Sequence, residues 1–236
     1  MSTTLSKGKK PLTQRWLGLL PALASVQPLF LLRRHGPLLC GVCLDATLRP
    51  DAYVPRAFFH NLAQPFPVLS ITAAAPALDA RGAAMEVKVE DEAKAAAAAQ
   101  SLLAAHPWLQ QQRLGLAEVV DHVADYVAGR FGGVVPFQTA PVELVLQACA
   151  WLERPELAQA VREAALAEMA QWPPRAFNII KSPQAWAERM APLCSPGAGP
   201  ALRATVEAQV AQHKLAAVPE LLLQADPPPV LDRRLC

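Results

Sequence analysis

The chain has 236 residues, of which 53% are hydrophobic and 18% charged, so it is long and apolar enough to bury a sizeable core. This composition excludes a chain that is disordered as a whole. The formal net charge is +2, from 22 basic and 20 acidic residues, which gives no single-sign field to attract nucleic acid or an anionic membrane to the whole surface. We therefore expect any partner to be recognised by a local patch.

The N-terminal residues combine lysines with a short apolar run. Residues 1–10 predict a flexible tail, and residues 11–25 place Leu12, Trp16 and Leu23 at the spacing of an amphipathic helix. A basic stretch ahead of a short apolar run is also the outline of an export signal. The helix accounts for the same residues and prolines interrupt the run, so we expect a soluble cytoplasmic protein without a membrane span.

After this helix the hydrophobic period changes from 3.6 to 2, and turn residues separate short segments. The clearest segment alternates Met85, Val87 and Val89 with charged side chains, as a strand with one solvated face does. The pattern predicts an antiparallel meander of four to five strands. The predicted strands cover residues 28–37, 38–46, 52–63, 67–75 and 85–90.

From Asp91 onward the pattern is helical. Asp91 is placed to cap one helix and Ser182 another, and several prolines stand at first helical positions, where a missing N–H costs least. Glycines 132 and 133 are placed to end the second helix. The predicted helices cover 92–106 and 114–133, begin near 141, 155 and 183, and include 201–215.

These elements predict an α+β fold: an N-terminal helix, an antiparallel meander and a C-terminal helical bundle. We expect residues 11–107 to form the helix and sheet region and residues 108–225 the helical region packed on it. Residues 226–236 form a second predicted tail. No Gly- or Ser-rich linker separates the two regions, so the sequence predicts a single globular unit.

Cys40 and Cys43 resemble a redox or metal-binding pair, but their setting is that of a strand. In an extended segment from Leu38 to Asp45 the two thiols point to opposite faces, and their α-carbons are roughly 10 Å apart. A disulfide allows about 7 Å. We therefore predict two core cysteines, no metal and no cofactor.

The remaining chemistry-bearing residues are scattered. The chain has five cysteines, an odd number, which favours reduced thiols and a cytoplasmic location. One alternative is a hydrolase that uses Cys43, or Cys149 with His122 as base and Asp121 or Asp125 as orienting group. The apolar neighbours of Cys149 are instead typical of a core thiol, so the sequence predicts no catalytic residue.

The best candidate for a recognition surface is a mixed cationic and aromatic patch on two neighbouring strands. Side chains of this kind are enriched at protein interfaces when they are exposed. A second possibility is that the helices bury this face. The candidate interface residues are Arg33, Arg34, His35, Arg56, Phe58 and His60.

These observations favour a non-enzymatic protein that binds another protein, such as a toxin or a secreted factor. The class would be antitoxin or immunity protein, adaptor, or secretion chaperone, and the Ala-, Pro-, Leu- and Arg-rich composition is typical of a GC-rich bacterial genome. The scattered Cys/His hydrolase is the first alternative. A nucleic-acid-associated factor that uses the basic and aromatic patch is the second, less favoured because the chain carries no strong positive charge.

Overall fold

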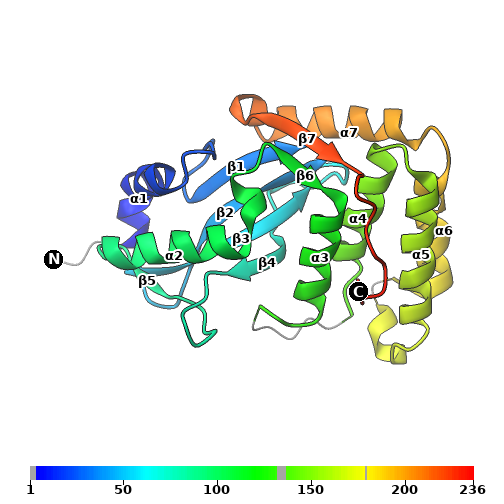
Figure 1. The fold of residues 1–236 in the computed structure, drawn as a ribbon, viewed down its shortest axis with the longest axis horizontal. Helices are drawn as coiled ribbons and strands as arrows, with labels where there is room; N and C mark the ends of the chain where they lie inside the picture. Colours follow the sequence, from blue (N-terminus) through cyan, green and yellow to red (C-terminus); the bar gives the residue numbers. More distant parts are fainter. Residues whose placement is uncertain (1–3, 132–136, 179) are drawn as a thin grey trace.

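The computed structural model describes residues 4–131, 137–178 and 180–236, and these residues form a mixed α+β fold (Figure 1). In this part of the chain the α-helices are α1 (Leu5–Leu19), α2 (Glu92–Ala105), α3 (Leu116–Val127), α4 (Ala140–Trp151), α5 (Pro155–Met169), α6 (Pro183–Met190) and α7 (Ala198–Gln212). The strands are β1 (Phe30–His35), β2 (Leu38–Ala46), β3 (Ala52–Asn61), β4 (Thr72–Pro76), β5 (Val87–Lys88), β6 (Arg113–Gly115) and β7 (Glu220–Gln224). A short 3-10 helix, η1 (Pro107–Leu109), follows α2.

The strands form one mixed sheet with the order β4-β3-β2-β1-β7-β6, and β5 pairs with β3. Neighbours from β1 to β4 are antiparallel, but β7 pairs parallel with both β1 and β6. The prediction of a purely antiparallel sheet is therefore wrong. The sequence places residues 113–115 and 220–224 in the helical region. In the structure they are strands β6 and β7, which extend the sheet beyond β1.

Two predicted helix caps are confirmed. The Asp91 carboxylate accepts a hydrogen bond from the Lys94 N–H at 2.9 Å, and the Ser182 hydroxyl oxygen accepts one from the Ala185 N–H at 3.0 Å. The first helix differs from the prediction at both ends. It begins at Leu5, inside the predicted tail, and ends before Pro21, because the residue preceding a proline resists the helical conformation. The predicted glycine cap at 132 and 133 lies outside the described residues.

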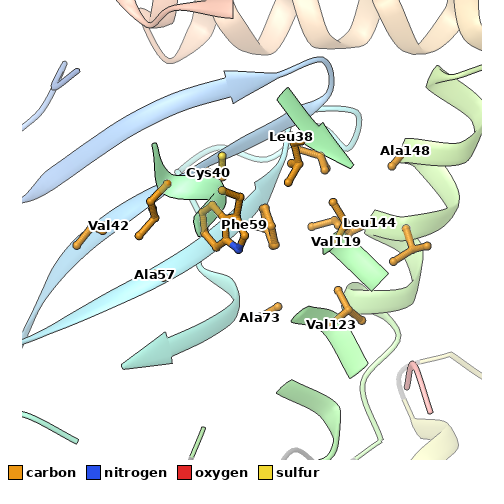
Figure 2. Close-up of a cluster of buried hydrophobic side chains, with 14 of the residues drawn as sticks. Leu38, Cys40, Val42, Ala57, Phe59, Ala73, Val119, Val123, Leu144 and Ala148 are labelled. Carbon is orange, nitrogen blue, oxygen red and sulfur yellow. The ribbon is translucent and has the colours of Figure 1, made fainter. Parts of the chain in front are cut away.

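The sheet buries apolar side chains on both faces, which explains why β2 is apolar at nearly every position. Cys40 belongs to the core cluster on the face covered by α3 and α4, and Cys43 to the cluster on the face covered by α7. The two thiols therefore face opposite ways and both are free, as predicted. Figure 2 shows Cys40 and Phe59 on the sheet opposite Val119 of α3.

Two glycines are required by close approaches of the chain. A Cβ atom on Gly41 would lie 1.9 Å from the backbone oxygen of Leu31 on the neighbouring strand. Gly36, in the turn between β1 and β2, has φ +56° and faces the Trp151 ring, whose Nε1 would be 2.6 Å from an added Cβ. These contacts fix β1 against β2 and the β1–β2 turn against the end of α4.

The C-terminal segment, predicted as a tail, packs along α3 and α5. Arg233 forms ion pairs with Asp121 and Asp125 of α3. Glu168 of α5 accepts hydrogen bonds from Arg234 Nε at 2.6 Å and from two backbone N–H groups of the last residues at 3.1 and 3.4 Å. Residues 235 and 236 are buried as a result.

Among the residues described, no helix has both the length and the apolar character needed to cross a lipid bilayer.

Candidate functional site

The six residues predicted as an interface are not gathered on one exposed surface. Arg33 and His35 point from β1 into the interior and are almost fully buried. Arg33 Nη1 donates to the Trp108 carbonyl at 3.2 Å, and His35 Nδ1 donates to the Leu222 carbonyl at 3.1 Å. Burial lowers the pKa of His35 to about 4. These two side chains connect β1 to η1 and to β7.

Arg34 and Arg56 remain partly exposed, but in different places. Arg34 pairs with Glu220 at the edge of a groove of about 490 Å³ between β1 and α7. Arg56 Nε forms an ion pair with Asp45 at 3.0 Å across the β2–β3 ladder. A partner contact at either residue stays a prediction.

Phe58 and His60 of β3 are buried on the face covered by α7, and the connection between β3 and β4 also covers them. Leu69 in this connection packs against the cluster that contains Phe58. Ser70 donates its backbone N–H to His60 Nδ1 at 3.1 Å, and its hydroxyl lies 2.9 Å from the same nitrogen. The covering segment, residues 62–71, is hereafter called the 62–71 loop.

The 62–71 loop exposes three large apolar side chains in six residues. Phe66 is 42% exposed, Val68 59% and Ile71 39%. The loop carries no charged residue. Exposed apolar side chains that occur singly are normal on a protein surface, whereas a group of them without charges is typical of a contact surface.

Hydrogen bonds hold the loop at its middle and near its C-terminal end. In the middle of the loop the Phe66 N–H donates to Gln209 Oε1 at 3.0 Å, and the Phe66 carbonyl accepts from Gln212 Nε2 at 3.2 Å and from His213 Nε2 at 3.1 Å. These three side chains lie at the end of α7, and Gln209 is buried. Near the C-terminal end of the loop, Ser70 is bonded to His60. The apolar side chains are therefore presented on a fixed backbone.

His60 has a defined tautomer in this arrangement. Because Nδ1 accepts from the Ser70 N–H, the neutral ring carries its proton on Nε2. Burial, with His213 nearby, lowers the pKa of His60 to about 4, so the ring is neutral at pH 7. The His60 ring therefore holds the 62–71 loop by accepting the hydrogen bond from the Ser70 N–H.

Sequence reasoning missed Phe66, Val68 and Ile71. It placed residues 67–75 in a strand, where alternate side chains would be buried, but β4 begins only at Thr72. A signal was present in the prolines at 65 and 67, which flank Phe66 and disfavour regular strand pairing.

The structure does not bring together the cysteine, histidine and aspartate side chains that the hydrolase alternative requires. Burial raises the pKa of Cys43 and of Cys149 to about 12, which keeps both thiols protonated and poorly nucleophilic. Cys149 does not line the cavity that contains His122. Asp121 and Asp125, the proposed orienting groups, are paired with Arg233.

The described residues include no group of three or more His, Cys, Asp or Glu side chains that could bind one metal ion.

Comparisons with family models, with curated proteins and with solved structures found no match.

Proposed function

We propose that the protein is a non-enzymatic binding protein that recognises another protein through the 62–71 loop. The observation that carries this proposal is the exposure of three large apolar side chains on an uncharged loop whose backbone is anchored at Phe66 and at Ser70. The class proposed is that of an antitoxin or immunity protein, an adaptor or a secretion chaperone. The five free cysteines support the cytoplasm as the place where it acts.

The anchoring matters for affinity as well as for shape. A loop that is already ordered loses little conformational entropy on binding, so more of the apolar contact energy appears as affinity. The hydrogen bonds from α7 and β3 provide this order before any partner arrives.

The chemistry of the loop also defines the partner. Because residues 62–71 have no charge, burying them requires no desolvation of an ion. We propose a partner with an apolar groove that receives Phe66 and Val68 at its centre and contacts the exposed amide of Gln212 at its rim.

Site-specific photo-crosslinking in the native cells tests this function. We expect a benzoyl-phenylalanine residue at Val68 to give an adduct with one defined protein. Leu48, in the β2–β3 turn, is the matched control, since it is apolar and fully exposed but stands apart from the loop. An adduct from position 68 that is absent from position 48 supports the proposal. No adduct at 68, or the same adducts at both positions, contradicts it.

Affinity for the protein identified in this way gives the second measurement. Val68→Asp places a charge at the centre of the proposed contact and should weaken binding at least tenfold, which is about 1.4 kcal/mol. Leu48→Asp should leave the dissociation constant unchanged. Because both positions are exposed, both variants should retain the wild-type melting temperature, and equal affinities of the two variants would count against the loop.

A further inference from the structure

A second site lies away from the loop, in a cavity of about 400 Å³ between the end of α2, η1 and α3. This volume is within the range of roughly 300–1,000 Å³ that small-molecule sites occupy. Its aromatic walls are His106, Trp108, His122 and Phe131. We call it the histidine pocket.

The walls of the histidine pocket support one another. The Trp108 ring stacks on Phe59 of β3 with their centroids 4.8 Å apart. The Phe131 ring lies 5.1 Å from His122 and 5.7 Å from His106. The two histidine rings meet edge to face at 5.1 Å. The cavity is therefore bounded by flat rings in fixed orientations, which suits a flat occupant.

Two histidines, His106 and His122, are among the polar side chains that line this cavity. His122 Nε2 donates to the Ala73 carbonyl at 2.6 Å, so in the neutral ring Nδ1 carries the lone pair. Burial lowers the pKa of His122 to about 4, and burial together with the neighbouring His122 lowers the pKa of His106 to about 3. At pH 7 both rings are neutral and each offers a hydrogen-bond acceptor.

These rings are suited to binding rather than to proton transfer. A general base works best when its pKa lies near the working pH, and groups that titrate near 3 and 4 are weak bases at pH 7. Of the carboxylates that line the pocket, Asp121 pairs with Arg233, and Asp125 pairs with Arg233 and Arg130. The third, Glu118, accepts a hydrogen bond from the Gly115 N–H at 2.8 Å. Because three carboxylates and one guanidinium, that of Arg130, line the pocket, its rim disfavours a negatively charged occupant.

We propose that the histidine pocket binds a small, uncharged aromatic molecule that carries a hydrogen-bond donor. The ring of the ligand would lie against Trp108 and Phe131, and its donor would bond to a nitrogen of His106, because His122 is already bonded to the Ala73 carbonyl. This binding is separate from the proposed protein recognition, because the 62–71 loop does not line the pocket.

Titration with p-cresol and toluene tests the proposal, since the two probes differ in a hydroxyl donor. Calorimetry or ligand-observed NMR should show that the wild-type chain binds p-cresol more tightly than toluene. His106→Phe keeps an aromatic ring and removes the polar atoms, so it should weaken p-cresol binding about tenfold and leave toluene binding unchanged. The probe 4-methylbenzoate, which adds a negative charge, should bind more weakly than p-cresol.

Two exposed alanines at the end of α2 locate the site. Ala105 lines the pocket and Ala104 does not, so Ala105→Trp should abolish binding of both probes while Ala104→Trp preserves it. Both variants should fold, because neither position is buried. The proposal is overturned if p-cresol does not bind, if Ala105→Trp leaves binding intact, if His106→Phe does not distinguish the probes, or if 4-methylbenzoate binds as well as p-cresol.

Discussion

At Gly41 a single hydrogen atom in place of a side chain allows β1 and β2 to pair. An added methyl group would lie 1.9 Å from the Leu31 backbone oxygen, and a backbone atom in the middle of a sheet cannot move aside. We expect Gly41→Ala to lower the free energy of unfolding by about 3 kcal/mol or more, measured by urea denaturation.

Gly18 is the matched control for this substitution. It is exposed in the last turn of α1, and an added Cβ would meet nothing within 4 Å. Gly18→Ala should raise the free energy of unfolding by about 0.5–1 kcal/mol, because alanine is the better helix former. Equal effects at the two glycines would show that β1 and β2 do not pack as described.

At the scale of elements, the sequence predicted best where the signal is local. Asp91 and Ser182 cap helices through hydrogen bonds to residues three positions later, so a short window of sequence is enough to predict these helix starts. The apolar run of β2 likewise indicates a strand that is buried on both faces. The parallel pairing of β7 with β1 joins residues that are 186 apart, such as Arg34 and Glu220. Periodicity within a short window carries no information about such a partner.

The candidate sites were harder to predict for the same reason. The arginine and histidine side chains of the predicted patch were identified as a group, but which of them are exposed depends on the helices and the loop that cover the sheet. His106 and His122 meet across the join of α2, η1 and α3. The fold determines which residues of the patch are exposed and which histidines come into contact, and the spacing of the residues in the sequence does not.

The C-terminal segment gives a prediction at this scale. Glu168 accepts three hydrogen bonds from the last three residues, so Glu168→Ala should release them and lower the free energy of unfolding by about 1–3 kcal/mol. The buried Cys236 thiol reports the release, because it should react faster with a thiol reagent in the variant.

Glu163, exposed on the same helix, provides the control. It accepts a hydrogen bond from Gln159 on its own helix, so Glu163→Ala should change stability by less than about 0.5 kcal/mol and leave Cys236 protected. Unchanged labelling of Cys236 in Glu168→Ala would show that other contacts hold the segment.

At the scale of the whole molecule, four buried histidines make stability depend on pH. Burial lowers the pKa of His35, His60 and His122 to about 4 and that of His106 to about 3, against 6.5 for an ordinary histidine. As the pH falls below 6.5, the unfolded chain takes up protons that the folded chain does not. The stability is therefore complete above this pH and is lost progressively toward pH 4.

Urea unfolding between pH 7 and pH 5 measures this loss. Each histidine should contribute up to about 1.4 kcal/mol per pH unit to the loss of stability. Most carboxylates have pKa values of about 4 and therefore stay ionised between pH 7 and pH 5. In His106→Phe the change in the free energy of unfolding per pH unit should be smaller by the contribution of one histidine. A free energy of unfolding that stays constant across the window would mean that these rings are hydrated or paired in the folded protein.

The proposed function depends on a property of the whole molecule: α7 and β3, far apart in the sequence, together hold an uncharged apolar loop in a fixed shape. Amide hydrogen exchange of the free protein tests this directly at Phe66 and Ser70, whose N–H groups bond to Gln209 and His60. We predict that both amides exchange much more slowly than in an unstructured peptide. Exchange of both at the unstructured rate would contradict the account, because the loop would then not be a pre-formed recognition surface.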